Sequence, residues 1–315
     1  MSWERLLEND QPGAPLRQRV DELFGQQRGT WPMLRDGEAA LGQLERKTLT
    51  ADGDSVIVQI NPARRRSTLA KTDAKSIAAR ACFLCPENMP AEERGVAFEG
   101  LVLMPNPFPI LPLHCTVADR EHRPQAIHGR VSTLVRLAYE IGCDLAALYN
   151  GPRCGASAPD HFHLQATLAA DIPLLSQLSA VRGDCAIAPH STFGRNMLVF
   201  RGADQNELVA NVERAIGVLQ QVCGTVDEPM LNLLAHFNAG QYTAVLFPRS
   251  AHRPACYFAT GEEQLLVSPA VLEMCGILVT TEMSHFDQLD SRVARMIYEE
   301  VSIDNSRFAE LTAKL

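Results

Sequence analysis

Residues 150–165 read NGPRCGASAPDHFHLQ and connect an apolar segment to a more polar one. Leu145–Asn150 is predicted to be a strand because it is short, apolar and followed directly by turn-forming residues. The loop Gly151–Pro159 is rich in Gly, Ser and Pro, and His161–Leu168 (HFHLQATL) then alternates as a strand does. The stretch therefore predicts two neighbouring strands with a polar loop between them.

The second of these strands carries an unusual set of polar side chains. Side chains two residues apart in a strand point to the same side, so His161, His163 and Gln165 are expected to share one face. Phe162 and Leu164 would point into the core behind them. Two imidazoles and an amide on one face, directly after a glycine-rich loop, indicate a binding or reaction site.

The pattern along the rest of the chain predicts the fold class. Residues 1–50 have helix-like spacing of apolar residues. Further strands are expected at Ser55–Asn61, Gly100–Met104, Leu113–Ala118, Asn196–Phe200, Leu231–Phe237, Tyr242–Phe247 and Gly276–Thr280, and helices at Gln125–Gly142, Gln205–Val222 and Phe286–Val301. Such an order predicts a mixed α+β fold, not a doubly wound sheet. After Asp171 the pattern partly starts again, which indicates a second half of related architecture.

The loop before the histidines is suited to holding a phosphate. Backbone N–H groups at Gly155, Ala156 and Ser157, and the Ser157 hydroxyl, can donate hydrogen bonds to phosphate oxygens. Arg153 could add a charge-assisted contact, and Asn150 opens the segment. An imidazole beside such a cradle suggests nucleophilic attack at phosphorus.

His163 is the predicted nucleophile. For that role its imidazole has to be neutral, with one ring nitrogen bare and the other hydrogen-bonded so that the tautomer is fixed. Gln165 would hold a non-bridging phosphate oxygen through its amide N–H while staying uncharged. The alternative is that a His-x-His pair is two satisfied polar residues on an exposed strand, or half of a metal site.

The run from Asn150 to Gln165 resembles the active-site signature of the galactose-1-phosphate uridylyltransferase branch of the histidine-triad superfamily. This branch includes diadenosine tetraphosphate phosphorylases and GDP-L-galactose phosphorylases, and its pattern is roughly N-x-G, G-x-S, H-x-H-x-Q. The resemblance implies that His163 attacks the α-phosphorus to form a nucleotidyl-histidine intermediate. Asp160 stands where hexose-phosphate transferases usually have proline, which favours the dinucleoside polyphosphate and GDP-sugar phosphorylases.

The resemblance extends over about residues 55–255. It implies an α+β chain of two fused histidine-triad-like halves, each a mainly antiparallel sheet with packed helices. The first half, residues 1–175, would hold the nucleophile and a zinc site. The second half, residues 176–315, would lack the nucleophile.

Other segments are similar to substrate-binding parts of these enzymes. Asn106, followed by His114, is similar to the asparagine–proline–histidine stretch that lines the nucleotide pocket. Arg249, His252 and Arg253 lie in a motif similar to one in the second half of the phosphorylases, where basic residues would meet the phosphates of the other substrate. Substrate contacts are therefore expected from both halves.

Cys82 and Cys85 have the C-x-x-C spacing that lets two thiolates converge on one tetrahedral ion. The sequence has no second C-x-x-C, so the remaining ligands should be histidines. By resemblance to the metal-bearing members of the superfamily these are His122 and His161, with His114 in reserve. Zinc here would brace the catalytic strand without taking part in the chemistry. A plain reduced cysteine pair is the alternative.

Composition limits the partners. The chain has 315 residues, of which 46% are apolar and 21% charged, as in soluble globular proteins. The net charge of −8 gives no reason to expect nucleic acid, and the basic run 64–66 is either a contact for a small anion or a solvated turn. We find no signal peptide and no apolar run long enough for a membrane, which predicts a cytoplasmic protein with no membrane partner. Of the nine cysteines, an odd number, most are interpreted as reduced thiols, and the close pair Cys82 and Cys85 is the exception.

Together these features predict a nucleotidyltransferase of the phosphorylase type. A dinucleoside polyphosphate or nucleotide sugar would give its nucleotidyl group to His163, and phosphate or a sugar phosphate would then accept it. The alternatives are a nucleotide hydrolase, in which water is the acceptor, and a catalytically inactive, zinc-stabilised nucleotide-binding protein. A homodimer is one option for the assembly, since dimers are common in this superfamily.

Overall fold

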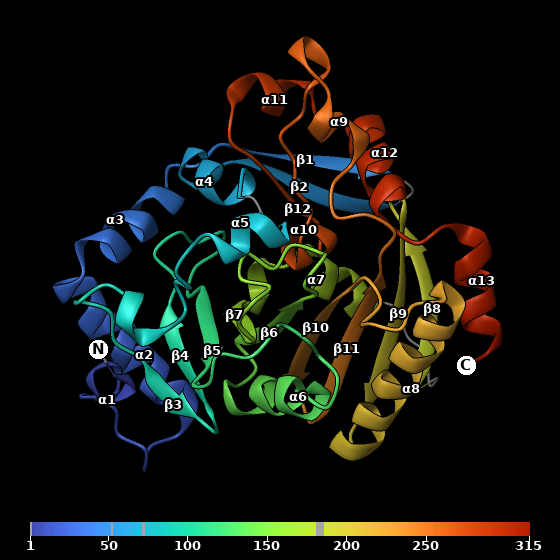
Figure 1. Cartoon of the computed structure of the whole chain (residues 1–315). Helices are drawn as coiled ribbons and strands as arrows, with labels where there is room; N and C mark the ends of the chain where they lie inside the picture. Colours follow the sequence, from blue (N-terminus) through green and yellow to red (C-terminus); the bar gives the residue numbers. More distant parts are fainter. Residues whose placement is uncertain (1, 52, 71–72, 181–185) are drawn as a thin grey trace.

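A nine-stranded sheet forms the centre of the molecule, in this computed structural model that describes residues 2–51, 53–70, 73–180 and 186–315 (Figure 1). Its strands are β3 (Val96–Phe98), β4 (Leu101–Pro105), β5 (Cys115–Asp119), β6 (Leu145–Asn150), β7 (His163–Leu168), β8 (Ile187–Thr192), β9 (Arg195–Gly202), β10 (Leu231–Asn238) and β11 (Gln241–Pro248). Their spatial order is β3-β4-β5-β7-β6-β10-β11-β9-β8, with antiparallel pairing throughout. The stretch 150–165 thus lies near the middle of this sheet.

A second sheet of three strands lies over one face of the large sheet (Figure 1). It contains β1 (Arg46–Ala51), β2 (Asp54–Ile60) and β12 (Ile277–Thr280). β1 and β2 are antiparallel, whereas β12 adds to β2 in parallel. Because β12 comes from the C-terminal part of the chain, this small sheet ties the two ends of the sequence together.

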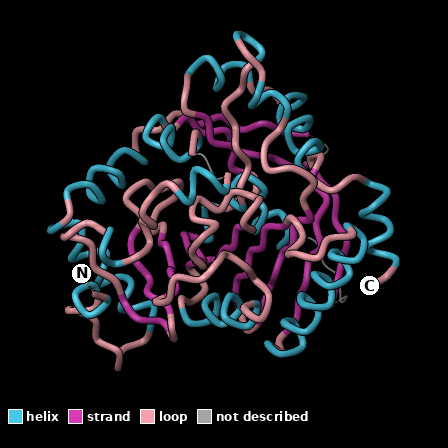
Figure 2. The backbone as a smooth tube through the Cα atoms, viewed as in Figure 1, coloured by secondary structure: helices cyan, strands magenta, loops and turns pink. Residues whose placement is uncertain are grey.

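Helices lie on both sides of the strands (Figure 2). On the side of the small sheet are α4 (Arg65–Thr68), α7 (Pro173–Ala180), α9 (Ala255–Phe258), α10 (Val271–Met274), α11 (Met283–Gln288) and α12 (Ser291–Val301). The remaining α-helices are α1 (Trp3–Leu6), α2 (Leu16–Thr30), α3 (Pro32–Leu41), α5 (Ala74–Ala78), α6 (Val131–Glu140), α8 (Gln205–Cys223) and α13 (Asn305–Ala313). Short 3-10 turns are η1 (Pro62–Arg64), η2 (Pro86–Asn88), η3 (Ala169–Asp171) and η4 (Gly261–Glu263).

The central strands feed two hydrophobic cores, one on each face of the large sheet. Leu145, Ala147 and Tyr149 of β6 belong to the core that includes α2, α6, α8 and α13. Ala146 and Leu148 of the same strand belong to the core under the small sheet. This alternation follows from the two-residue period of a strand and explains why β6 is apolar along its whole length.

The same alternation decides where the polar residues of β7 point. Phe162, Leu164 and Ala166 belong to the core with α2, α6 and α8, as predicted for the first two. His163 and Gln165 therefore face the other way, toward the side of the sheet that carries the small sheet and α10.

The α+β prediction is confirmed, and the differences from the sequence-based elements are local. β7 begins at His163, so His161 lies in a bend before the strand and not on its face. The predicted helix Gln125–Gly142 is shorter, since α6 covers only Val131–Glu140. The basic run 64–66 is helical and not a loop, and the Arg66 side chain lies outside the described part of the chain.

Residues 1–50, predicted to be helical, end in part of β1. The proposed division at residue 175 falls within α7, and β6 and β10 continue one sheet across the two halves. That division remains a prediction.

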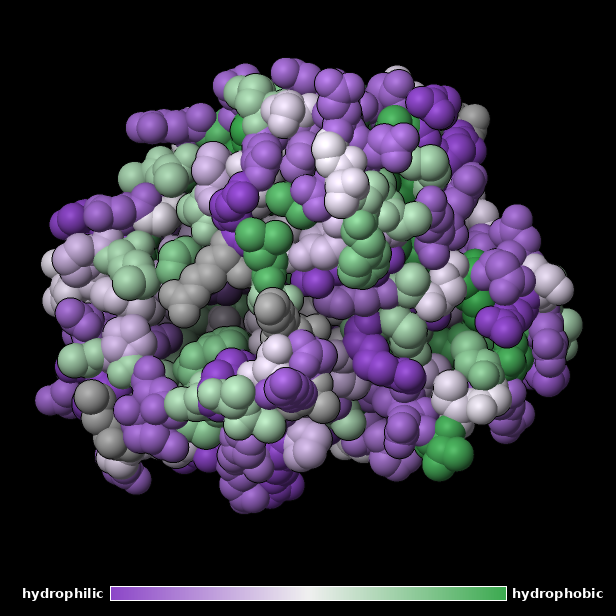
Figure 3. Space-filling view, turned by 45° about the horizontal axis from the view of Figure 1, so that its top comes forward, coloured by the Kyte–Doolittle hydropathy of each residue, from purple (hydrophilic) through white to green (hydrophobic). Residues whose placement is uncertain are grey.

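None of the described helices is long and apolar enough to cross a membrane. In the space-filling view, hydrophilic residues cover most of the visible face, and hydrophobic residues appear in separate groups (Figure 3).

Candidate active site

His163 opens β7, and its ring is held by the residue two positions before it. Its Nδ1 lies 2.9 Å from the carbonyl oxygen of His161. A carbonyl oxygen can only accept, so Nδ1 carries the proton and Nε2 keeps its lone pair. Gln125 fixes the backbone of His163 by accepting from its N–H at 2.8 Å and donating to its carbonyl oxygen at 3.0 Å. The sequence did not show which group fixes the tautomer of His163, and in the structure it is the carbonyl oxygen of His161.

Burial also keeps the His163 ring neutral. It lowers the pKa of His163 to about 4, an effect partly opposed by the hydrogen bond to His161. The residue is only 3% exposed. Near pH 7 the imidazole is therefore uncharged with Nε2 bare, which is the form that a nucleophile needs.

Gln165 lies two residues further along β7, and its neighbours determine which way its amide points. The backbone N–H of Ile110 donates to Nδ1 of His114 at 3.2 Å, so the proton of that ring is on Nε2. This N–H donates to Oε1 of Gln165 at 3.1 Å. The amide oxygen is occupied, and the NH₂ group of Gln165 is left as a donor.

His114 is thus part of this hydrogen-bond chain, and its reserve role as a metal ligand is wrong. Its Nδ1 and Nε2 are bonded to Ile110 and Gln165. Burial and the positive charge of Arg64 lower the pKa of His114 to about 4, so it donates to Gln165 as a neutral ring.

Asn150, at the end of β6, has its side-chain amide oriented like that of Gln165, with the oxygen occupied. Its Oδ1 accepts from the backbone N–H of Val271 and from Nδ2 of Asn232, both at 2.8 Å. The oxygen is again occupied by internal donors, and the NH₂ group remains. Both partners lie in the second half of the chain, so Asn150 also joins the two halves beside the predicted site.

The loop after Asn150 keeps consecutive backbone donors unpaired. Among the residues that the structure describes, none accepts from the N–H groups of Gly155, Ala156, Ser157 or Ala158. Ala156 and Ala158 are 1% and 0% exposed, and an unpaired N–H in such surroundings costs roughly 1–3 kcal/mol. A bound anion would remove that cost, as expected of the predicted phosphate cradle.

Across a pocket, the cradle faces residues of the second half. The pocket is lined by Arg64, Thr68, Ala70, Gly155, Ala156, Ser157, His252, Arg253, Ser268, Ala270, Glu273 and Val279. It brings residues 155–157 together with His252, Arg253 and Arg64. His163 and Gln165 lie outside this lining, although Arg64 acts electrostatically on the His114 that orients Gln165.

The basic wall of this pocket is already ordered by its own contacts. Arg253 donates from Nε to Oγ of Ser268 at 2.9 Å and from Nη2 to the carbonyl oxygens of Thr68 and Ala70 at 3.0 and 3.1 Å. Burial and the neighbouring Arg253 lower the pKa of His252 to about 3. The positive charge of the wall near pH 7 therefore comes from Arg253 and Arg64, not from His252.

Arg249 has a structural position instead of the predicted place in the substrate pocket. It is 2% exposed, and it is absent from the pocket lining. Its guanidinium donates to Oδ1 of Asn232 and to the carbonyl oxygens of Ala251, His252, Pro269 and Val301. It therefore holds the segment that carries His252 against β10.

Two further predicted contacts also point elsewhere. Arg153 is exposed, and its Nη2 donates to the carbonyl oxygen of Glu228 at 3.1 Å. Oδ1 of Asn106 accepts from the N–H of Phe108 at 2.9 Å and stabilises a local turn. Neither side chain lies in the described lining of the pocket.

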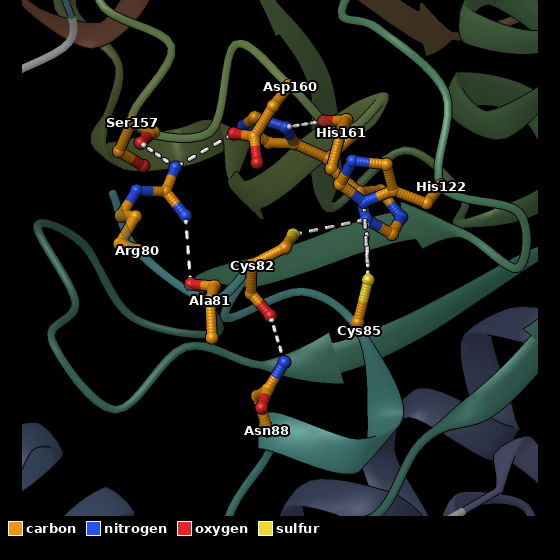
Figure 4. A network of polar contacts seen from close by, with 10 residues as sticks. Arg80, Ala81, Cys82, Cys85, Asn88, His122, Ser157, Asp160 and His161 are labelled. Carbon is orange, nitrogen blue, oxygen red and sulfur yellow. Dashed lines mark hydrogen bonds and ion pairs between the residues drawn. The ribbon is translucent and has the colours of Figure 1, made fainter. Parts of the chain in front are cut away.

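The four predicted metal ligands come together in one cluster, around the side chain of His161 (Figure 4). Their ligand atoms, from Cys82, Cys85, His122 and His161, all lie within 4.8 Å of one another. The distances from Nδ1 of His161 to the two sulfur atoms are 3.4 and 3.6 Å, and Nδ1 of His122 is 3.3 Å from Sγ of Cys85. Bond lengths to zinc predict about 3.6 Å for the sulfur–nitrogen edge of a tetrahedron.

The donor chemistry of this cluster also fits a cation. Nε2 of His161 lies 2.8 Å from the carbonyl oxygen of Asp119, so Nε2 carries the proton and the bare Nδ1 faces the sulfur atoms. Burial and the neighbouring Cys82 raise the pKa of the Cys85 thiol to about 12, a situation that a divalent ion would reverse. The four residues can hold a metal ion.

Two family models match the chain. A domain of unknown function (DUF4922) matches residues 23–168, and the GDPGP1-like C-terminal domain matches residues 176–315. No curated protein sequence matches the chain. The predicted resemblance to the phosphorylase and transferase branch of the histidine-triad superfamily is confirmed.

The solved structures show the same fold. Yeast Ap4A phosphorylase Apa2 in complex with AMP aligns over 86% of this chain and 95% of its own, with 16% identity and a TM-score of 0.56. The same yeast enzyme in complex with Ap4A aligns over 87% and 97%, with 15% identity and a TM-score of 0.55. A uridylyltransferase mutant aligns over 86% and 99% at 12% identity, with a TM-score of only 0.37. The chain therefore has the α+β fold of the yeast Ap4A phosphorylase over most of its length.

Sequence reasoning missed two polar residues near the site, Gln125 and Arg80, and did not predict the contact of His114 with Gln165. Gln125 brackets the backbone of His163, His114 orients Gln165, and Arg80 forms an ion pair with Asp160 at 2.8 Å. The role of Asp160 was open in the sequence. Each of these contacts joins segments that are far apart in the chain, and no local pattern reveals them.

Proposed function

We propose that this protein is a nucleotidyltransferase of the phosphorylase type that works through a nucleotidyl-His163 intermediate. Its first substrate is a dinucleoside polyphosphate or a nucleotide sugar, and its acceptor is phosphate or a sugar phosphate. The coarser class, a nucleotide phosphorylase or transferase, is supported by the GDPGP1-like match and by the fold of yeast Apa2, whose structures hold AMP and Ap4A.

The fixed tautomer of His163 carries this proposal. A ring that donates from Nδ1 to the His161 carbonyl and stays neutral at pH 7 has its Nε2 lone pair left, for which the described residues supply no hydrogen-bond partner. The unpaired donors of residues 155–158, in the loop that leads into β7, would hold the phosphate in this proposal.

The reaction takes two displacements at one phosphorus atom. Nε2 of His163 attacks the α-phosphorus, a P–N bond forms, and the P–O bond to the leaving phosphoryl group breaks with its electron pair on that oxygen. An oxygen of the acceptor then attacks the same phosphorus, and the P–N bond breaks with its electron pair returning to Nε2. His163 ends as it began.

The donors around the loop would stabilise the charge that develops on the non-bridging oxygens. The amide groups of Gln165 and Asn150 have their oxygens occupied, so each presents N–H bonds. Removing one such donor from an active site typically lowers kcat about 10²- to 10³-fold. Arg64 and Arg253, on the opposite wall of the pocket, would bind phosphates of the leaving group or acceptor.

Zinc is the ion that we propose for the cluster, since two thiolates and two imidazoles are a usual zinc ligand set. Cys82, Cys85, His122 and His161 would hold it, and its role is structural. His161 connects the cluster to the reaction site because its side chain faces the sulfur atoms and its carbonyl oxygen orients His163.

The test is to trap the intermediate. The purified protein is incubated with a panel of dinucleoside polyphosphates and nucleotide sugars, without acceptor, and its intact mass is measured near neutral pH because a phosphohistidine bond is acid-labile. A mass increase of one nucleotidyl group in wild type and in the exposed-histidine control His128→Ala, but not in His163→Ala, is expected.

Product analysis with and without phosphate identifies the acceptor. A nucleoside diphosphate formed only with phosphate supports the phosphorylase, whereas a monophosphate formed in water alone supports a hydrolase. Tight nucleotide binding with neither adduct nor product would overturn the proposal in favour of a binding protein.

A further inference from the structure

We propose that Arg80 is a positioning residue that clamps the phosphate-binding loop to the metal cluster and thereby sets the affinity for the phosphates of the nucleotide. This inference rests on the proposed function of the loop. It concerns a residue outside every motif identified in the sequence.

Arg80 contacts the loop at two points (Figure 4). Its Nη2 donates to Oδ1 of Asp160 at 2.8 Å and to the carbonyl oxygen of Ser157 at 3.4 Å. Its Nη1 donates to the carbonyl oxygen of Ala81, and the guanidinium lies 4.9 Å from the ring centroid of Phe83. The Arg80 and Asp160 side chains are 26% and 17% exposed, so the ion pair is partly shielded from water.

Both ends of this clamp adjoin metal ligands. Arg80 lies two residues before Cys82, and Asp160 directly precedes His161. The ion pair of Arg80 with Asp160 therefore closes a ring. The ring runs from Arg80 to Cys82, across the cluster to His161, and back through Asp160 to Arg80. A segment fixed in this way has little freedom to move without breaking either the ion pair or the cluster.

The contact with Ser157 affects the donors of the loop. The C=O and N–H of one peptide unit point in opposite directions. Holding the Ser157 carbonyl toward Arg80 therefore turns the N–H of Ala158 away from it, and that N–H is one of the consecutive donors without an acceptor in the described structure. Arg80 also compensates the negative charge of Asp160, which would otherwise repel a phosphate bound next to it.

The predicted effect is on binding more than on chemistry. Arg80→Ala should raise the KM for the nucleotide about tenfold with kcat changed less than about threefold, because the nucleophile and Gln165 are untouched. Arg80→Lys should recover part of the affinity, since an ammonium can pair with Asp160 but is a poorer match for two acceptors at once. Arg123→Ala, which removes an exposed ion pair beside His122, is the matched control and should leave KM unchanged.

Two further measurements keep this test independent of the proposed reaction. Metal content per chain should be equal in wild type and Arg80→Ala, which excludes loss of the cluster as the cause. Hydrogen exchange of the peptide covering residues 154–162, where the amides of Cys154 and His161 are hydrogen-bonded, should become at least about fivefold faster in Arg80→Ala.

Unchanged KM together with unchanged exchange would overturn the clamp, and so would a fall in kcat at constant KM. If wild type turns over none of the substrates, the proposed function fails instead, and the exchange measurement alone decides whether Arg80 holds the loop.

Discussion

Two hairpins lie next to each other in the middle of the sheet, and they differ in the segment that joins their strands. Residues 151–162 connect β6 to β7, whereas only Ala239 and Gly240 connect β10 to β11. Ala239 and Gly240 have φ angles of +50° and +76°, as in the tight turns that favour antiparallel pairs. The long connection carries the cradle and His161, and the short one carries no polar function.

The strand faces differ in the same way. On the side of the small sheet, β7 presents His163 and Gln165, whereas β11 presents Val245 and Phe247 to the hydrophobic core. The second hairpin thus has the same scaffold with its face filled by apolar side chains. The comparison teaches that the sheet supplies stability in both hairpins and that the proposed chemistry depends on one loop and one strand face.

The second half still reaches the site, but from the open end of its hairpin. Asn232 pairs with Asn150 in the sheet. The start of β10 and the end of β11 therefore lie at the same end of the central strands as the cradle. The segment after β11 carries His252 and Arg253 into the pocket. The turn at Ala239 lies at the opposite end of these strands, away from the site.

The largest expected effect is the difference in turnover between two variants, each with a histidine of one hairpin replaced by alanine. His163→Ala should reduce turnover by about 10³-fold or more because the nucleophile is removed. His236→Ala, in β10, should leave turnover within about twofold, since within the described ranges the hydrogen bond of the His236 ring is to the carbonyl oxygen of Cys143. Steady-state kinetics on the substrate found by mass spectrometry measures both, and comparable losses would contradict the division of roles between the hairpins.

The next effect concerns the other polar residue of β7. Gln165→Leu should lower kcat about 10²-fold because one donor to the phosphate is lost and the N–H of His114 loses its acceptor. His163 should still form the nucleotidyl adduct, only more slowly. A single-turnover measurement checks this, and an unchanged rate of adduct formation would remove Gln165 from the proposed site.

Loss of the metal should affect the first hairpin and spare the second. Cys82→Ser is expected to reduce metal affinity and turnover by about 10- to 100-fold, because the ion braces the segment whose carbonyl oxygen orients His163. Metal analysis and kinetics test this together. Cys143→Ser, at an exposed cysteine away from the cluster, is the control. Full activity in a metal-free Cys82→Ser protein would show that the ion is not needed for positioning.

Much of the hairpin framework could be predicted from the sequence. The apolar runs of β6, β10 and β11 were placed to within a residue or two because each is short, apolar and bounded by turn residues. The H-x-H-x-Q and C-x-x-C patterns identified residues that the structure does bring into two groups. Local spacing was sufficient where function depends on neighbours in the chain.

The errors arose where tertiary contacts decide. His161 lies before the strand, with its ring against Cys82 and Cys85, and no strand pattern predicts these contacts. Arg249 belongs to a motif similar to a phosphate-binding one, but whether a guanidinium faces a pocket or internal carbonyl groups depends on the packing of distant segments. The pairing of His114 with Gln165 likewise joins the residue before β5 to β7, and the two are far apart in the sequence.

Glycine substitutions compare the two connections directly. Gly155 has a φ of +99°, and a Cβ there would lie 2.5 Å from Cβ of Ala270, so Gly155→Ala should reduce the free energy of unfolding by about 2 kcal/mol and disturb the cradle. Gly240 has a φ of +76° with open space around it, so Gly240→Ala should lose only about 1 kcal/mol. Denaturant titration measures the two, and only Gly155→Ala should also raise the KM for the nucleotide.

The smallest effect is expected from lengthening the second connection. A Gly-Ser-Gly insertion between Ala239 and Gly240 should lower the free energy of unfolding by about 1 kcal/mol or less, through the entropy of closing a longer loop. Turnover should stay unchanged, because this turn lies at the end of the strands away from the cradle. The same insertion between Pro152 and Arg153 should cost still less stability, because the closure cost grows with the logarithm of the loop length, yet it should lower turnover at least about tenfold, since it displaces the donors of residues 155–158. Melting temperatures and kinetics of the two insertion variants distinguish a loop that only joins strands from one that holds a substrate. Equal turnover in both would mean that the long connection is as dispensable as the short one, and the cradle would then have to lie elsewhere.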